Sequence, residues 1–360
     1  MKIFHFYFFF GLVCASATLD AQPILTAQDK GDKLLWHPAA ASIRSGNAVI
    51  AVQVNDTLGG IFNPHKGLFN IGTADNRPLL FKFPQELYTS YLNVRVDGTV
   101  HSNNPFLTNV QTLPAASNPE RLSDGTIICS YRVGNIAIEQ RLKPEQYTSL
   151  TGAIRIQYLI TNNDVSTHQI GLLLLLDTNI NDKDDARVWT SFGYRQGEHH
   201  FVSPMMPDYF QAFERTDLDS TGLVAQGTLV GGEAVRPDLL VISDWNFLND
   251  VVWDYTPQQL PFYNDSAVLL RWNEQRLAAG EKRLITTYYG LGDVSTQSGP
   301  LTLTLTAPTR LDAIAGQLTP NPFDVNLIVQ NNGFVAATDL RATLILPRGL
   351  ELPIGESASK

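Results

Sequence analysis

The stretch GLLLLLDTNINDKDDARVW, residues 171–189, decides the fold because its two halves have opposite characters. Residues 172–176 are five consecutive leucines, and an unbroken apolar run cannot be half solvated. The run therefore predicts a strand that is buried on both faces. Asp177 follows directly, where the chain should leave the core, and a buried carboxylate there needs hydrogen bonds or a cation.

The rest of the sequence consists mainly of short β-branched and aromatic runs between turn residues, which is typical of strands. Strands are predicted at 47–54, 91–98, 126–133, 136–142 and 152–160. No run has a convincing helical period, and 26 glycines and 20 prolines interrupt the chain. We expect an all-β fold, with a large β-sandwich or supersandwich followed by a smaller β domain.

The boundary between these two domains is predicted in GDVSTQSGP, residues 292–300. We assign 1–21 to a signal peptide, 22–295 to the large domain and 300–360 to an immunoglobulin-like domain. The last segment offers only three or four strands, whereas such a sandwich needs about seven. The immunoglobulin-like domain is therefore predicted to be partial and truncated at its C-terminus, as in a fragment of a longer protein.

The N-terminus, MKIFHFYFFFGLVCASATLDAQ, has a lysine, a short apolar run and then small residues, which is the pattern of a secretory signal peptide. The apolar run is too short to span a bilayer comfortably. We expect a secreted or cell-surface protein with no membrane insertion after cleavage. Cys129 is then the only cysteine, and its apolar surroundings predict a buried, inert thiol.

Acidic residues number 35 against 26 lysines and arginines, which gives a net charge of −9. This balance disfavours nucleic acid as a partner, since such proteins need a concentrated basic face. It also disfavours docking on anionic lipid.

The oxygen-rich loop after the leucines has two interpretations. Asp177, Asn179, Asn181 and Asp185 stand at positions 1, 3, 5 and 9 of a Ca²⁺-loop pattern. However, the glycine of position 6 and the glutamate of position 12 are absent. A solvated loop is the favoured interpretation, with a weak Ca²⁺ site as the alternative and no other cofactor expected.

Aromatic residues crowd into 189–272, which holds four of the five tryptophans. Flat rings can stack on the C–H faces of sugars, so an exposed group of them would suit a glycan. Core packing is the other interpretation, because large rings usually supply core area. The predicted ligand-binding aromatics are Trp189, Tyr194, Tyr209, Trp245, Trp253 and Tyr255.

No catalytic motif is present, and an enzyme is the less favoured interpretation. Glycoside hydrolysis needs two carboxyl groups that face each other. The weak candidates for acid or base are Glu198, His199, Glu214 and Asp254, which lie among the aromatics. An exposed polar segment is the alternative for all four.

Three resemblances extend this interpretation. LDTNINDKDD, PDLLVISDW, WDYT and NDSAVLLRWNE, all within 150–292, resemble an uncharacterised module of bacterial secreted and cell-surface proteins. NPFDVNLIVQNNGFVAATDLRATLILPRGLEL resembles immunoglobulin-like repeats of the CARDB and NEW3 type. NDTLGGIFNP resembles the opening hairpin of galactose-mutarotase-like supersandwiches. The resemblance of the central region implies a surface-associated β domain and supplies no reaction, and the supersandwich resemblance concerns the fold alone.

Two functions therefore remain open. The first is a non-catalytic secreted or surface module, structural, adhesive or ligand-binding, with an extracellular glycan or a surface protein as its partner. The second is a carbohydrate-binding or carbohydrate-active protein on a mutarotase-like supersandwich. A cleft with two facing carboxylates, or a carboxylate and a histidine, would favour an enzyme. The ligand, the anchor and the oligomeric state are not determined by the sequence.

Overall fold

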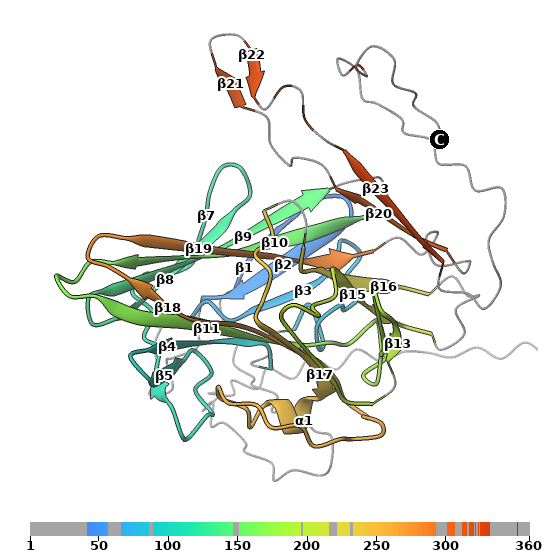
Figure 1. Ribbon diagram of the computed structural model, residues 1–360, viewed down its shortest axis with the longest axis horizontal. Coiled ribbons are helices and arrows are strands. Elements are labelled where there is room, and N and C mark those ends of the chain that lie inside the picture. Colours follow the sequence, from blue (N-terminus) through green and yellow to red (C-terminus); the bar gives the residue numbers. More distant parts are fainter. Residues whose placement is uncertain are drawn as a thin grey trace, which may run out of the picture.

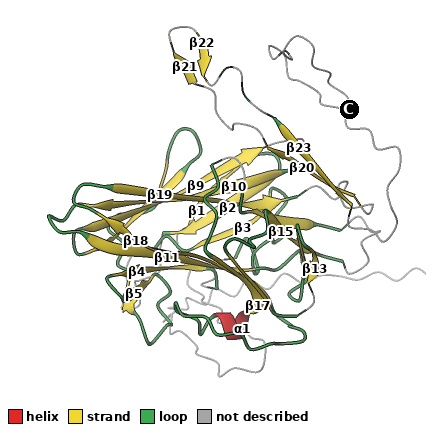
Figure 2. Ribbon diagram, in the orientation of Figure 1, coloured by secondary structure: helices red, strands yellow, loops and turns green. Residues whose placement is uncertain are grey.

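The computed structural model describes residues 42–292 except 57–65, 86–88, 147–150, 196, 216–221 and 231–232. It also describes residue 351 and short segments within 301–331. The fold is all-β, as predicted, and α1 (Trp245–Leu248) is the only helix in the part described (Figures 1 and 2). No helix in that part is long and apolar enough to cross a membrane. The predicted signal peptide lies outside the described residues.

Two large sheets form the sandwich (Figure 1). The nine-stranded sheet contains, in spatial order, β13 (Gly193–Arg195), β12 (Arg187–Thr190), β15 (Tyr209–Phe213), β16 (Val224–Thr228), β19 (Lys282–Leu291), β10 (Gly152–Asn162), β9 (Ile136–Gln146), β8 (Ile127–Val133) and β7 (Glu120–Arg121). The seven-stranded sheet contains β14 (His199–Val202), β17 (Leu239–Asp244), β18 (Ser266–Leu277), β11 (His168–Asp177), β4 (Tyr91–Val96), β5 (Thr99–Ser102) and β6 (Gln111–Thr112).

Smaller sheets complete the described structure. A three-stranded sheet of β1 (Ser42–Gly46), β2 (Ile50–Asn55) and β3 (Phe69–Thr73) adds apolar residues to the core between the large sheets. In the C-terminal part, β20 (Leu301–Thr306) pairs with β23 (Asn326–Asn331), and β21 (Asp312–Ile314) pairs with β22 (Gln317–Thr319). The prediction of a partial immunoglobulin-like domain concerns residues that mostly lie outside the described part.

The leucine run forms the C-terminal half of β11, and its burial on both faces is confirmed. Leu172, Leu174 and Leu176 lie in the core between the two large sheets. Leu173 and Leu175 lie in a second cluster, on the outer side of the seven-stranded sheet, where α1 and the segment after it pack. A strand covered on both sides requires apolar residues at every position, which explains the unbroken run.

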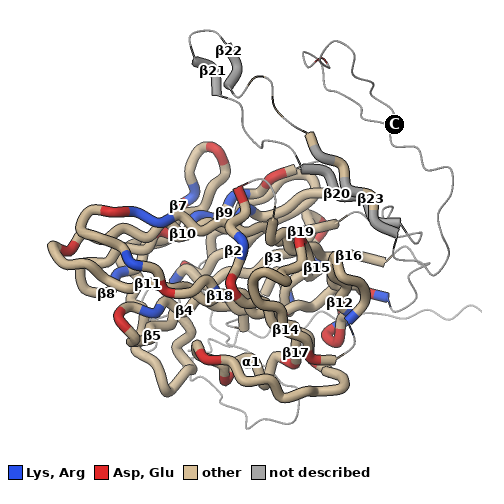
Figure 3. Tube along the Cα trace, in the orientation of Figure 1, with Lys and Arg blue, Asp and Glu red and all other residues tan. Residues whose placement is uncertain are grey.

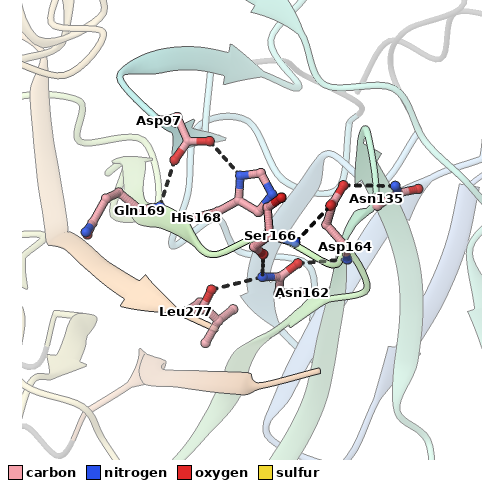
Figure 4. A network of polar contacts seen from close by, with 8 residues as sticks. All are labelled: Asp97, Asn135, Asn162, Asp164, Ser166, His168, Gln169 and Leu277. Atoms are coloured by element: carbon pink, nitrogen blue, oxygen red, sulfur yellow. Dashed lines mark hydrogen bonds and ion pairs between the residues drawn. The ribbon is translucent and has the colours of Figure 1, made fainter. Parts of the chain in front are cut away.

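The start of β11 is held by a polar network (Figure 4). Asp97, in the turn between β4 and β5, accepts hydrogen bonds from the Gln169 backbone N–H at 2.8 Å and contacts His168 Nδ1 at 2.6 Å. Asn162 Nδ2 donates to the carbonyl oxygens of Ser166 and Leu277. These contacts join the β4–β5 hairpin, β11 and the end of β18 at one end of the sandwich.

Charged residues are interspersed along the sheets rather than separated by sign (Figure 3). On the outer side of the nine-stranded sheet, Arg155 lies between two carboxylates. Its Nε is 3.2 Å from Glu145, and its Nη1 is 3.0 Å from Glu233. Gln157 Nε2 donates to the same Glu233 carboxylate at 3.2 Å. This network fastens the segment that carries Glu233 to the sheet.

Candidate functional site

Three carboxylates from three segments meet at the end of the central strand. Oxygens of Asp177, Asp184 and Asp265 all lie within 4.8 Å of one another. Asp177 ends β11, Asp184 lies in the following loop, and Asp265 directly precedes β18. The antiparallel register explains this meeting, because Asp177 pairs with Ala267, two residues beyond Asp265. Asp177 and Asp265 are buried, and Asp184 is half-buried.

Local hydrogen bonds position this carboxylate cluster. The Asp177 backbone N–H donates to Ser90 Oγ at 2.9 Å, and the Ser266 N–H donates to the Asp184 carbonyl at 2.6 Å. Asn179 Nδ2 donates to Asp184 Oδ1 at 2.9 Å. Hard cations such as Ca²⁺ prefer oxygen ligands of this kind. Within the described part of the chain, these three carboxylates are the group that could hold a metal ion.

The cluster differs from the four ligands that the loop pattern predicts. Asp177 belongs to it, and Asn179 contacts it through its amide nitrogen. Asn181 instead donates to Glu214 Oε1 at 2.9 Å. Asp185 forms an ion pair with Lys183 at 2.7 Å. Asp184 and Asp265 were not predicted, since a spacing pattern within one loop cannot include a residue brought in by strand pairing.

Trp189 and Tyr194 form an aromatic pair at the edge of the nine-stranded sheet. They lie opposite each other in the β12–β13 hairpin, with ring centroids 5.9 Å apart, and both are half-buried. Gln211 of β15 lies opposite Trp189, and its Nε2 donates to Gln226 Oε1 on β16 at 2.9 Å. Directly opposed residues point to the same face of a sheet. We call Tyr194, Trp189, Gln211 and Gln226 the aromatic row.

The aromatic row faces away from the core, because the alternate residues of the same strands belong to the core between the sheets. Tyr209, two residues before Gln211, shares this face and is half-buried. Trp189 Nε1 has no hydrogen-bond partner among the described residues. Arg187 lies over the Tyr194 ring, 5.7 Å from its centroid. The row and Arg187 thus present two half-buried rings, the half-buried amide of Gln226 and an exposed cation, whereas Gln211 and Trp189 Nε1 are buried.

The other three predicted aromatics lie on the outer side of the seven-stranded sheet. Trp253 is buried at 4% exposure between Arg95 and Arg271, whose guanidinium carbons lie 5.5 and 5.9 Å from its ring. Trp245 Nε1 donates to the Thr89 carbonyl at 2.9 Å. Tyr255 packs against the same outer cluster and donates its hydroxyl proton to Glu198. The six predicted aromatics therefore form two groups, three on each large sheet.

Glu198 holds the segment that follows Tyr255. Its carboxylate accepts hydrogen bonds from the Tyr255 hydroxyl and from the backbone N–H groups of Gln258 and Leu260. Burial alone would raise the pKa of Glu198, but these hydrogen bonds outweigh it and hold the pKa below its ordinary value. A carboxyl group in this state is poorly suited to donate a proton near neutral pH.

The remaining three candidates for acid or base have separate surroundings. Glu214 accepts hydrogen bonds from Asn181 and from the Leu223 N–H, at 2.9 and 2.6 Å. Asp254 is 86% exposed and lies 3.9 Å from Arg95. His199 Nδ1 lies 3.4 Å from the Gly197 carbonyl. Among the described residues, no hydrogen bond or ion pair joins any two of Glu198, His199, Glu214 and Asp254.

Comparisons with known proteins yield structural similarities only. No protein-family model matches the chain, and neither does any curated protein sequence. A putative aldose 1-epimerase from Escherichia coli K12 is 11% identical, with a TM-score of 0.41, over 70% of this chain and 98% of that chain. A galactose mutarotase-like protein from Lactobacillus casei ATCC 334 is 8% identical, with a TM-score of 0.39, over 70% of this chain and 100% of that chain.

A polysaccharide lyase is 12% identical, with a TM-score of 0.32, over 82% of this chain and 43% of its own. At these scores the similarity concerns the arrangement of strands and says nothing about chemistry. The fold class is an all-β sandwich. The resemblances to the secreted module and to CARDB and NEW3 repeats stay predictions.

Proposed function

We propose that this protein is a non-catalytic β-sandwich that binds carbohydrate through the aromatic row and acts outside the cell. The Trp189–Tyr194 pair carries the proposal, because it places two partly exposed rings side by side at a sheet edge. Aromatic rings offer apolar faces for sugar C–H groups, and the half-buried amide of Gln226 can donate to a hydroxyl. Gln211, at 3% exposure, positions Gln226 through their 2.9 Å hydrogen bond.

The absence of catalysis is supported by the roles of the candidate acids. Glu198 accepts hydrogen bonds from three donor groups of one loop, and Glu214 accepts hydrogen bonds from Asn181 and the Leu223 N–H. Both carboxylates therefore serve to hold neighbouring segments in place. Action outside the cell is supported by the sequence of residues 1–21, which has the pattern of a signal peptide.

The test is a screen of the chain lacking residues 1–21 on a glycan array, followed by calorimetric titration with the polysaccharides that bind. We expect Trp189→Ala and Tyr194→Ala each to weaken binding by about tenfold or more, since truncating a Trp or Tyr that anchors a binding surface costs about 2 kcal/mol or more. Phe106→Ala is the matched control, because Phe106 is 41% exposed and lies beyond β5 on the other sheet.

Binding that is unchanged in both Trp189→Ala and Tyr194→Ala, or no binding to any glycan on the array, would overturn the proposal. Release of reducing sugar ends during incubation would support the alternative, a carbohydrate-active enzyme. The melting temperature of each variant is measured as well, and binding is compared only among variants that melt at the wild-type temperature. A loss of binding then does not reflect a loss of folding.

A further inference from the structure

Arg187 and Arg155 both lie on the outer side of the nine-stranded sheet, but their surroundings differ. It precedes Trp189 by two residues, so it shares the face of the aromatic row, and it is exposed. Its guanidinium carbon lies 5.7 Å from the centroid of the Tyr194 ring. No carboxylate lies within ion-pair distance of Arg187 in the part of the chain described, whereas Arg155 lies between Glu145 and Glu233.

The carboxylates nearest in sequence and register are engaged elsewhere. Asp185, two residues before Arg187, is paired with Lys183 at 2.7 Å. Arg187 pairs across the sheet with Phe213, whose neighbour Glu214 accepts hydrogen bonds from Asn181 and from the Leu223 N–H. Within the described residues, Arg187 is therefore a cation that lies over the Tyr194 ring and has no carboxylate at ion-pair distance.

A guanidinium group binds carboxylate and sulfate groups through two parallel N–H···O hydrogen bonds. The contact with the Tyr194 ring holds the Arg187 guanidinium beside the surface on which a sugar ring would lie. The protein as a whole carries a charge of −9, so an anionic polymer is attracted only where a local cation is available.

Resting on the proposed function, we propose that the glycan bound by the aromatic row is acidic, with Arg187 binding a carboxylate or sulfate group of the sugar that stacks on Trp189 and Tyr194. The acidic group is the feature that separates this ligand class from neutral glycans. Because the contact is between opposite charges near the surface, binding weakens as salt is added.

The experiment measures binding of the chain lacking residues 1–21 to immobilised alginate, chondroitin sulfate and neutral galactan. Alginate tests the carboxylate and chondroitin sulfate tests the sulfate. Arg187→Gln removes the charge, and Arg276→Gln is the matched control, since Arg276 is exposed on β18, on the other sheet, and donates to Thr167 Oγ1 at 3.4 Å. Arg187→Lys keeps the charge without the bidentate geometry.

We expect an acidic polymer to bind at least about tenfold more tightly than galactan, with the preference lost in Arg187→Gln, weakened in Arg187→Lys and kept in Arg276→Gln. Equal affinity for galactan and the acidic polymers would overturn this inference and leave the proposed function standing. An Arg187→Gln variant that matches Arg276→Gln would overturn it as well. Binding to none of the three polymers, and to no glycan on the array, would overturn both.

Discussion

Trp253 lies so close to Gly171 that no side chain fits between them. A Cβ atom built on Gly171 would be 2.6 Å from Cη2 of Trp253 and 2.9 Å from the backbone nitrogen of Glu274. Gly171 immediately precedes the leucine run of β11. The glycine therefore allows the segment after α1 to cover the outer side of the seven-stranded sheet, where Leu173 and Leu175 need cover.

Gly171→Ala is expected to destabilise the protein by about 1–3 kcal/mol, because overpacking forces side chains or backbone to move. The free energy of unfolding from urea denaturation measures this cost. In a Trp253→Ala background the same substitution should cost less, since the nearest obstructing atom has been removed. An equal cost in both backgrounds would contradict the contact described above.

Acid should weaken the network at the start of β11. The pKa of the Asp97 carboxyl is lowered by the hydrogen bond from the Gln169 N–H and by the contact with His168. A carboxyl with a lowered pKa in the folded state stabilises the fold above its unfolded pKa of about 3.9. That stabilisation is lost as the pH falls through the folded value.

Melting temperatures between pH 7 and pH 2 check this dependence. Asp97→Asn should melt below the wild type at pH 7, and the difference should shrink as the pH falls below about 4. Asp254→Asn is the control, because Asp254 is 86% exposed and lies 3.9 Å from its arginine partner. A constant difference between Asp97→Asn and wild type across this range would refute the prediction.

Calcium should act through Asp265 rather than through Asp185. A cation held by the carboxylate cluster raises the melting temperature in excess calcium, by an amount that corresponds to about 2.7 kcal/mol at one hundred times its dissociation constant. Asp265→Asn should abolish this rise, whereas Asp185→Asn should keep it, because Asp185 is paired with Lys183. Melting in calcium and then in chelator provides the measurement.

A wild-type midpoint that does not change at calcium concentrations on the order of 10 mM would eliminate the cation site. The cluster would then be three carboxylates held by protein hydrogen bonds alone. If Asp185→Asn lost the calcium-dependent rise in melting temperature and Asp265→Asn kept it, the result would instead support the ligands that the loop pattern predicts.

Cys129 should be unreactive in the folded protein. Its side chain is buried, and burial raises the pKa of the thiol to about 12, so almost none of it is thiolate near neutral pH. In the chain lacking residues 1–21, Cys129 is the only cysteine, so labelling with a thiol-specific disulfide reagent reports on it alone. We expect labelling only after denaturation. Rapid labelling under native conditions would disprove the prediction.

Strand positions could be predicted because they depend on local periodicity. The predicted strand at 152–160 is β10, and Ile154, Ile156 and Tyr158 all lie in the core between the sheets. The run at 172–176 is buried on both faces, as its composition requires. In each case the repeat of apolar residues along one strand carries the information, so no knowledge of distant segments is needed.

The candidate site depends on pairing between segments that are distant in the sequence. Local residue patterns do not show which strands pair or in which register. Asp177 meets Asp265 only because β11 and β18 are neighbours in the register that places Asp177 opposite Ala267. Trp189 and Trp253 have the same residue type in one aromatic-rich stretch, yet one lies in the aromatic row and the other is buried on the opposite sheet. Residue type and spacing determined that this chain forms a β-sandwich with a doubly buried central strand. Strand order and register, which are set by long-range packing, decided which side chains share a face.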